Sequence, residues 1–428
     1  MRVLFVHQNF PGQYLHLAPA LAARGDDVVA VAIEAQQSLP GVRVACYKPH
    51  RGSSASVHPW VLDIETKVIR GEAAAHCALE LREKGFRPDV ICAHPGWGEA
   101  LFLKDVFPET RLLSFIEFFY RANGADYDFD PEFPEDDLPG RCRLRMKNAN
   151  SLLNIDAADW CVSPTHWQAD TVPDRYRSRF SVIHDGIDTD RVKPDPRAHV
   201  KLAKAGLTLR PGDEVITFVN RKMEPYRGFH VFMRALPEIQ RRRPNSITLI
   251  VGGDDVSYGK RLAKGESWRQ RMLAEVGSRL DMERVRFVGR IAYPEFVAML
   301  QVSAVHVYLT YPFVLSWSML EAMSAGCVVV GSATGPVQEV IDDGHNGLLV
   351  DFFSTAGIAD AIDRVLSHPD RMAGLRARAR QTVVEHFDLK RFCLPRHVAL
   401  VDAVASGNLP PNLDAATPIV TAAPSPAG

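Results

Sequence analysis

Residues 308–332, YLTYPFVLSWSMLEAMSAGCVVVGS, combine an apolar strand, a short loop, a helix and a second apolar strand. The helix is expected to begin between Ser316 and Ser318 and to end at Gly326, because glycine suits the left-handed turn that follows a helix. A strand, a helix and a further strand at this spacing are typical of a parallel sheet covered on both faces. The stretch therefore predicts an α/β fold.

The same alternation occupies most of the chain, in two series. The first includes the apolar runs at 2–8, 26–33, 88–94 and 111–117, and the second extends from EVITFVN (214–220) to GLLVDF (347–352). A polar, proline-containing segment at 184–197 separates them. We therefore predict two doubly wound, Rossmann-like domains, whose ligands bind at the carboxyl ends of the strands.

The boundaries follow from where the apolar pattern stops. We expect an N-terminal domain at 1–185, a C-terminal domain at 198–385, a helix at 386–408 that packs back on the N-terminal domain, and a disordered tail at 409–428. The tail is rich in Pro and Ala and almost uncharged.

Composition excludes several classes of protein. The 428 residues contain 50 Lys and Arg against 51 Asp and Glu, so no strong basic field is available for nucleic acid. The seven cysteines are scattered without metal or redox spacing, which is typical of reduced thiols in a cytoplasmic protein. No apolar run reaches the length of a membrane-spanning helix, and the first residues do not resemble a signal peptide.

The start of the helix at 316–326 is a candidate anion site. Free backbone N–H groups and the positive end of the helix dipole at Trp317 to Met319 favour a bound phosphate. Glu321 has two interpretations: it caps its own helix, or it accepts hydrogen bonds from a ribose diol beside a bound diphosphate.

A second candidate site follows the strand at 214–220, in the segment NRKMEPYRG (220–228). Arg221 and Arg227 lie where guanidinium groups can reach phosphate oxygens. A solvated basic turn is the alternative.

Taken together and in this order, these segments resemble the retaining glycosyltransferases of family 4, which have the GT-B fold of two facing Rossmann-like domains with a cleft between them. The resemblance covers most of residues 1–405. It rests on these five segments: 9–28, 162–194, 220–228, 284–300 and LEAMSAGCVVVGSATGPVQEVIDDGHNGLLV at 320–350.

The resemblance implies roles for individual residues. Arg221 and Arg227 would clamp the diphosphate of a nucleotide-sugar donor, Arg227 standing where the family usually has Lys, and Glu321 would bind the ribose. The remaining implied donor contacts are Ser316, Ser318 and Met319 at the diphosphate, Gly289, Arg290 and Ile291 at the base, and Gly12 in the amino-terminal loop.

The implied reaction retains the configuration of the anomeric carbon through front-face attack by an acceptor hydroxyl. It would need neither a metal nor another cofactor, because two Arg and a helix N-terminus stabilise the leaving diphosphate. The acceptor would be a carbohydrate or a lipid-linked sugar in polysaccharide or glycolipid biosynthesis.

Two positions depart from the family pattern. Phe313 replaces a Glu that usually contacts the donor sugar, and Glu117 stands where many members have a His near the reacting carbon. Glu117 and His94 are catalytic candidates at strand ends, with solvated or structural roles as the alternatives. His7, Asn9 and Phe10 are candidates for acceptor binding.

Two further points stay open. The basic run at 141–147, with Arg141, Arg145 and Lys147 on one helical face, is usually a solvated face, but could contact a phosphorylated lipid or the inner face of a membrane. Besides a transferase, the sequence is compatible with a sugar-nucleotide epimerase on the same fold and with a catalytically silent nucleotide-sugar-binding or scaffold protein.

Overall fold

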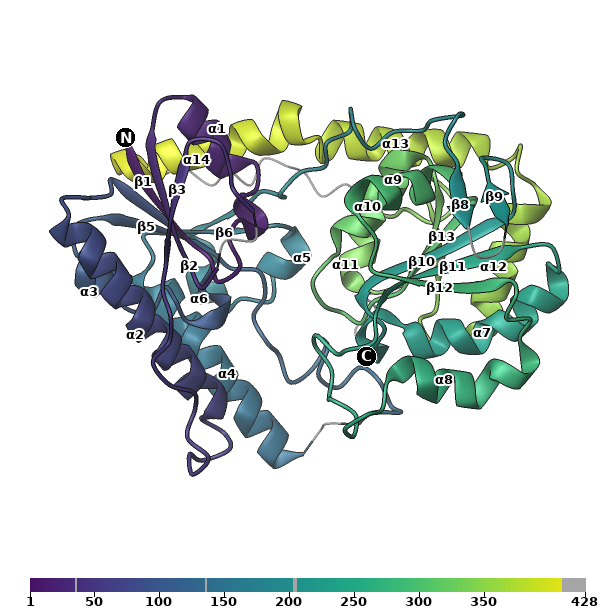
Figure 1. Ribbon diagram of the computed structural model, residues 1–428, viewed down its shortest axis with the longest axis horizontal. Helices are drawn as coiled ribbons and strands as arrows, with labels where there is room; N and C mark the ends of the chain where they lie inside the picture. Colours follow the sequence, from purple (N-terminus) through teal and green to yellow (C-terminus); the bar gives the residue numbers. More distant parts are fainter. Residues whose placement is uncertain (35–36, 135–136, 203–205, 410–428) are drawn as a thin grey trace. The chain divides into compact units, whose positions relative to one another are not determined.

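The computed structural model describes residues 1–34, 37–134, 137–202 and 206–409, and it divides into two compact units (Figure 1). Unit 1 contains Met1–Gly186 and the described residues from Lys390 onward, and unit 2 contains Ile187–Leu389. Residues 410–428, which make up nearly all of the tail predicted to be disordered, lie outside the described residues.

Unit 1 is built on a seven-stranded parallel sheet in the order β3-β2-β1-β4-β5-β6-β7. Its strands are continuous apolar runs because both faces are covered: Val3 and Phe5 enter one core, whereas Leu4 and Val6 enter the other. The strands are β1 Arg2–Val6, β2 Asp27–Ala32, β3 Val42–Cys46, β4 Val90–Ala93, β5 Arg111–Phe115, β6 Trp160–Ser163 and β7 Phe180–Val182.

Helices cover both faces of this sheet. Apolar residues of α2 and α4 pack on one face, and those of α1 and α14 pack on the other. The helices of unit 1 are α1 Leu17–Ala23, α2 Leu62–Glu83, α3 Leu103–Val106, α4 Leu138–Ala157, α5 His166–Ala169, α6 Asp174–Arg177 and α14 Leu394–Ser406, with 3-10 turns at Gly12–Tyr14 and Pro95–Trp97.

The C-terminal segment of the described chain returns to unit 1. Residues 386–408 comprise the end of α13, a π-helical turn at Leu389–Cys393 and then α14. Leu400, Val401 and Val404 of α14 are fully buried in the same cluster as Val3 and Phe5, and α14 lies beside α1 in Figure 1. The structure thus places this helix against the N-terminal sheet.

Unit 2 contains a six-stranded parallel sheet in the order β12-β11-β10-β13-β14-β15 and a small antiparallel pair, β8-β9. α9, α10 and α13 contribute to one core, while α7 and α12 pack together on the other side, where Phe218 of β10 stacks on Phe232 of α7 at 4.5 Å between ring centroids. The elements are β8 Val200–Leu202, β9 Leu207–Leu209, β10 Val215–Lys222, α7 Phe229–Arg242, β11 Ile247–Gly253, α8 Trp268–Val276, β12 Val285–Gly289, α9 Tyr293–Val302, β13 Val305–Tyr308, α10 Trp317–Ala325, β14 Val328–Ser332, α11 Gly335–Gln338, β15 Leu348–Val350, α12 Thr355–Ser367 and α13 Ala373–His386, with 3-10 turns at Pro225–Arg227 and Gly277–Arg279.

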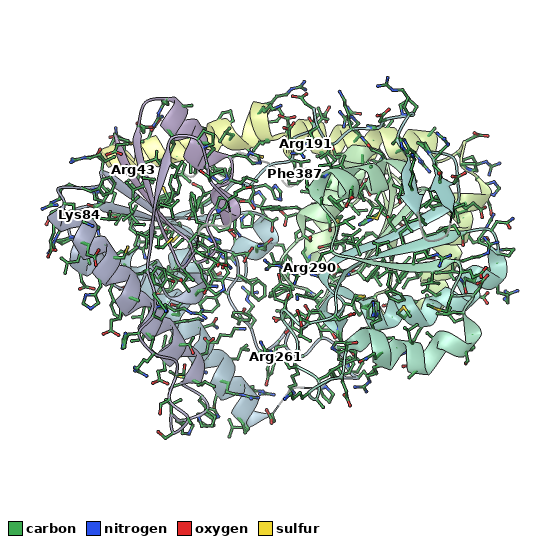
Figure 2. The ribbon with its side chains drawn as sticks, in the orientation of Figure 1. Arg43, Lys84, Arg191, Arg261, Arg290 and Phe387 are labelled. Atoms are coloured by element: carbon green, nitrogen blue, oxygen red, sulfur yellow. The ribbon has the colours of Figure 1, made fainter. Side chains whose placement is uncertain are left out.

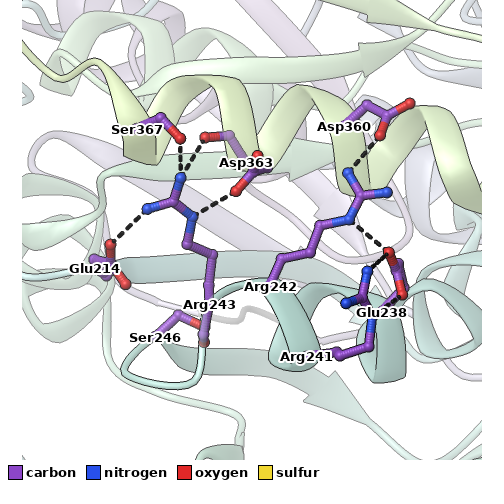
Figure 3. A network of polar contacts seen from close by, with 9 residues as sticks. All are labelled: Glu214, Glu238, Arg241, Arg242, Arg243, Ser246, Asp360, Asp363 and Ser367. Carbon is purple, nitrogen blue, oxygen red and sulfur yellow. Dashed lines mark hydrogen bonds and ion pairs between the residues drawn. The ribbon is translucent and has the colours of Figure 1, made fainter.

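An ion-pair network joins α7 to α12 (Figure 3). Arg242 bridges Glu238 of its own helix, at 2.6 Å, and Asp360 of α12, at 2.5 Å. Arg243 donates to Asp363 at 2.6 Å and also to Ser367 and Glu214. The network holds together two helices that cover one face of the sheet, away from the carboxyl ends of its strands.

Two predictions from the sequence can be compared directly. Both series of strands form parallel sheets, and α10 begins and ends where the sequence predicted, with Ser316 as its N-cap and Gly326 left-handed at φ 86°. Within the described residues, no helix combines the length and apolar character needed to cross a membrane.

Candidate functional site

Polar side chains gather in unit 1 at the carboxyl ends of β1, β4 and β5, which are neighbours in the sheet. His7 follows β1, His94 follows β4 and Glu117 lies just beyond β5. Gln13 and Trp97 join them from the adjacent 3-10 turns. We call these five residues the unit-1 cluster.

Hydrogen bonds fix the tautomer of His7. The backbone N–H of Asn9 donates to His7 Nδ1 at 3.0 Å, so the ring proton is on Nε2, which donates to Gln13 Oε1 at 2.9 Å. Gln13 Nε2 in turn donates to Glu117 Oε1 at 3.3 Å. Burial, together with the neighbouring His94 ring, lowers the pKa of His7 to about 3, so this ring is a neutral part of the chain of hydrogen bonds.

His94 meets the other oxygen of Glu117. It caps the turn Pro95–Trp97, where the Gly96 N–H donates to His94 Nδ1 at 3.2 Å, so its ring proton also lies on Nε2. Nε2 is buried, has no hydrogen-bond partner and lies 3.7 Å from Glu117 Oε2. Trp97 packs against both imidazoles, with ring centroids 4.8 Å from His94 and 4.9 Å from His7.

Gly12 has a structural reason to be glycine. Its φ is 48°, and a Cβ built on it would lie 2.2 Å from His7 Nε2. The amino-terminal loop therefore approaches His7 closely at Gly12. The proposed contact of Gly12 with a donor stays a prediction.

The predicted acceptor residues separate in the structure. His7 joins the unit-1 cluster, and Asn9 is half-buried beside it. Phe10 is 0% exposed and packs in the apolar core, 6.4 Å from the ring of Phe5. We correct the prediction for Phe10, because a ring enclosed by the core presents no surface to an acceptor.

In unit 2 the candidate donor residues gather around the N-terminus of α10. We call Arg227, Tyr293, Tyr308, Ser316 and Glu321 the α10 cluster. Ser316 Oγ accepts the N–H of Ser318 at 3.4 Å and lies 3.1 Å from Ser318 Oγ, while the Met319 N–H bonds the Ser316 carbonyl at 3.3 Å. The N–H groups of Ser318 and Met319, predicted to be free, are therefore engaged within the start of the helix. The dipole orientation of this first turn still favours an anion.

Arg227 is a buried cation that organises the loop before α10. Its Nη1 contacts Thr310 Oγ1 at 2.8 Å, the Val314 carbonyl at 2.9 Å and Tyr308 Oη at 3.2 Å. The same Tyr308 oxygen accepts the N–H of Ser316 at 2.8 Å, so Arg227 is linked to the N-cap through one hydroxyl. The tight turn into α7 depends on Gly228, whose φ is 67° and whose added Cβ would lie 2.4 Å from Leu309 Cβ.

Glu321 does not cap its helix, contrary to one of the two interpretations of the sequence. It is the fifth residue of α10, outside the first turn, and Ser316 performs the capping. Glu321 is 7% exposed and accepts a hydrogen bond from Tyr293 Oη at 2.7 Å. Burial raises the pKa of this carboxyl to about 7, although Tyr293 and Arg191 act in the opposite direction.

The remaining donor candidates lie at neighbouring strand ends. Arg221 is exposed near the end of β10, and the next residue, Lys222, forms an ion pair with Asp255. β12 ends at Gly289, with φ 70°, and Arg290, labelled in Figure 2, follows it. Arg290 is exposed, and Ile291 packs against the core. β10, β11 and β12 are adjacent, so these groups share one edge of the sheet.

Phe313, which replaces the expected Glu, belongs to an aromatic group. Its buried ring lies edge-on to Tyr258 at 4.9 Å and to Tyr226 at 5.5 Å, and the Arg227 guanidinium lies 5.9 Å from its centroid. This position therefore carries a buried aromatic ring instead of the carboxylate that the resemblance predicts there.

The basic run at 141–147 lies on α4, and one of its members differs from expectation. Arg141 and Arg145 are exposed, but the Lys147 ammonium lies 3.6 Å from the centroid of the Tyr120 ring. Lys147 therefore makes a cation–π contact within unit 1 instead of extending the surface patch.

Several functional candidates were missed from the sequence. Gln13, Trp97, Tyr293 and Tyr308 complete the two clusters. The first three lie within a few residues of the predicted site residues Gly12, His94 and Ile291, and Tyr308 ends the strand before α10. Their nearness to predicted residues could have identified them, but the sequence does not show in which direction a side chain points. Among the described residues, no group of three or more His, Cys, Asp or Glu side chains could hold a metal ion.

Two family models match the chain in succession. Glycosyl transferase family 4 group matches residues 24–192, and Glycosyl transferases group 1 matches residues 201–382. Together they cover parts of both units and all of the α10 cluster, but His7 and Gln13 of the unit-1 cluster precede the first match.

Curated relatives are glycosyltransferases. D-inositol 3-phosphate glycosyltransferase from Nocardia farcinica is 31% identical over 233 residues, which is 53% of this chain and 49% of the relative. This chain thus spans about half the length of the first such relatives it matches. Glycogen synthase from Mycobacterium tuberculosis is 25% identical over 421 residues and 91% of each chain.

Solved structures share the fold across nearly the whole chain. Sucrose-phosphate synthase from Thermosynechococcus elongatus superimposes with a TM-score of 0.72 at 20% identity, covering 95% of this chain and 100% of that one. HepE from Anabaena, solved in complex with UDP-glucose, has a TM-score of 0.64 at 16% identity and covers 95% of this chain and 99% of that one.

Proposed function

The chain belongs to the family 4 glycosyltransferases, and from that premise we propose that it transfers a sugar from a nucleoside diphosphate sugar to a hydroxyl acceptor with retention of anomeric configuration. The observation that carries the proposal is the α10 cluster: a capped helix N-terminus, a buried guanidinium tied to that cap, and a buried carboxylate on the same helix.

The α10 cluster and the residues at the neighbouring strand ends each match one part of such a donor. The first turn of α10 and Arg221 offer positive charge to a diphosphate, and Arg227 holds the loop that leads into that turn. Glu321 accepts hydrogen bonds from the ribose hydroxyls, with Tyr293 orienting the carboxylate. Gly289, Arg290 and Ile291 border the base. HepE was solved with UDP-glucose, so uracil is the first base to test.

The reaction forms a bond between the acceptor oxygen and the anomeric carbon and breaks the bond from that carbon to the diphosphate oxygen. The acceptor proton passes to the leaving diphosphate. Because the departing group gains negative charge, Arg221 and the helix N-terminus lower the barrier without a protein nucleophile. We propose that this charge stabilisation makes a metal or other cofactor unnecessary.

The unit-1 cluster supplies neutral donors and one carboxylate, which suit hydroxyl groups. We therefore propose a carbohydrate or lipid-linked sugar as the acceptor, in polysaccharide or glycolipid assembly. All seven cysteines are free thiols, which supports a reducing compartment such as the cytoplasm.

The test is nucleoside diphosphate release from UDP-, GDP- and ADP-sugars, with and without a panel of sugar acceptors. Acceptor-dependent release from one donor, with the α-linkage kept in the product, is expected. Donor turnover without any acceptor would favour the epimerase, and nucleotide binding with no turnover at all would favour a binding or scaffold protein.

A further inference from the structure

A chain of hydrogen-bonded side chains in unit 1 ends at Glu117. Its Oε1 accepts from Gln13 Nε2 at 3.3 Å, and Gln13 Oε1 accepts from His7 Nε2 at 2.9 Å. His7 is fixed in turn by the Asn9 N–H at 3.0 Å and by contact with Gly12. Gln13 is therefore the bridge between a rigid loop and the Glu117 side chain, which is 36% exposed.

The other oxygen of Glu117 faces a donor that it does not reach. His94 Nε2 carries a proton, because Gly96 N–H occupies Nδ1, and it lies 3.7 Å from Glu117 Oε2. At that separation one oxygen atom can lie within hydrogen-bonding distance of both. A sugar hydroxyl is such an atom, since it accepts one hydrogen bond and donates another.

We propose that Gln13 is a positioning residue, which holds Glu117 away from His94 so that His94 Nε2–H and Glu117 Oε2 together bind one sugar hydroxyl. This inference rests on the proposed transferase function. Without the Gln13 amide, Glu117 Oε1 loses this donor and the carboxylate is no longer held at this distance from His94, so the hydroxyl loses the geometry that joins its two partners.

The test uses Gln13→Glu, which keeps an acceptor for His7 Nε2–H but replaces the donor to Glu117 with a second carboxylate. It is made alone and with Glu117→Gln, which restores a donor and an acceptor at the same contact. Gln381→Glu is the matched control, because the Gln381 amide also donates to a glutamate, Glu385, at 2.7 Å but on an exposed helix face.

With the donor found above, Gln13→Glu should lower kcat roughly tenfold to a hundredfold while the donor KM changes less than about twofold. The same change should cost little further activity in the Glu117→Gln background. In thermal unfolding, Gln13→Glu should lower Tm by about 3 °C or more in the Glu117 background only, and Gln381→Glu should be near neutral.

The proposal is overturned if Gln13→Glu leaves kcat within about twofold of wild type, or if it is equally harmful with Gln at position 117, since Gln13 would then act elsewhere. A wild-type protein that turns over no nucleotide sugar removes the proposed function instead. In that case the Tm cycle still decides whether Gln13 holds Glu117.

Discussion

The unit-1 cluster and the α10 cluster both lie at carboxyl ends of parallel strands, but their side chains differ in charge and in burial. In unit 1, two imidazoles have fixed neutral tautomers and a partly exposed carboxylate faces them. In unit 2, a buried guanidinium and a helix N-terminus surround the loop at 310–316. Similar sheets thus carry groups that we propose bind hydroxyls in one unit and a diphosphate in the other.

The two carboxylates sharpen this difference. Glu117 is accessible and is oriented by an amide, whereas Glu321 is buried and is oriented by a phenol. Burial makes Glu321 costly to ionise, so its ionised form is favoured when a ligand donates hydrogen bonds to it. A ribose diol supplies two such donors.

The largest expected effect comes from Arg227→Met. It leaves the Val314 carbonyl, Thr310 Oγ1 and Tyr308 Oη without their shared donor, so the free energy of unfolding should fall by about 3 kcal/mol. Urea denaturation measures this loss. Arg221→Met, at an exposed arginine in the same segment, is the control. It should change the free energy of unfolding by less than about 0.5 kcal/mol but should abolish nucleotide binding. Equal stability of the two variants would refute the structural role of Arg227.

Glu321→Gln should weaken nucleotide-sugar binding and raise the free energy of unfolding. The folded pKa of about 7 lies above the usual value of 4.5 for a glutamate, so the folded state holds the extra proton and the free energy of unfolding falls as pH rises between these values. At pH 8 the neutral amide should therefore stabilise the protein by about 3 kcal/mol, and at pH 4.5 the difference should vanish. Thermal and urea unfolding at both pH values check this. A gain that is independent of pH would show that Glu321 is not the titrating group.

Tyr293→Phe should also reduce the affinity for a nucleotide sugar, but by less than the change of Glu321 itself. Losing the 2.7 Å hydrogen bond moves the pKa of Glu321 further upward, so affinity for a nucleotide sugar should fall by about 1 kcal/mol, or fivefold, at pH 7. Calorimetric titrations at pH 6, 7 and 8 should show the variant recovering most of its affinity at the highest pH. A uniform loss at all three pH values would assign Tyr293 a direct ligand contact instead.

The smallest effect is expected outside both clusters. Asp360→Asn removes one exposed partner of Arg242 from the link between α7 and α12 (Figure 3). Such pairs contribute roughly 0.2–1 kcal/mol, and nucleotide affinity should not change. A measurable loss of binding would mean that the back of the sheet is coupled to the strand ends.

The sequence was sufficient for the parts of the fold that depend on local pattern. The apolar runs at 26–33 and 327–332 became parallel strands because continuous apolar character needs cover on both faces. The bounds of α10 could be predicted because Ser316 and Gly326 have chemical preferences of their own at helix ends.

Tertiary contacts decided the rest. Phe10 is a single apolar residue in a glycine-containing loop, so no periodicity distinguishes a core ring from a ligand contact. Gln13, Tyr293 and Lys147 have ordinary polar surroundings in the sequence, and only the folded chain shows which way each side chain points.

The most direct test of the division of labour between the clusters is a thermal-shift titration with UDP-, GDP- and ADP-sugars, comparing wild type with Arg221→Ala, Glu321→Ala and His94→Ala. One class of nucleotide sugar should stabilise wild type and His94→Ala, by about 2.7 kcal/mol at 100 times Kd. It should fail to stabilise Arg221→Ala and Glu321→Ala. If no nucleotide sugar shifts the wild type, or if His94→Ala abolishes the shift as completely as Arg221→Ala, the assignment of the donor to the α10 cluster is wrong.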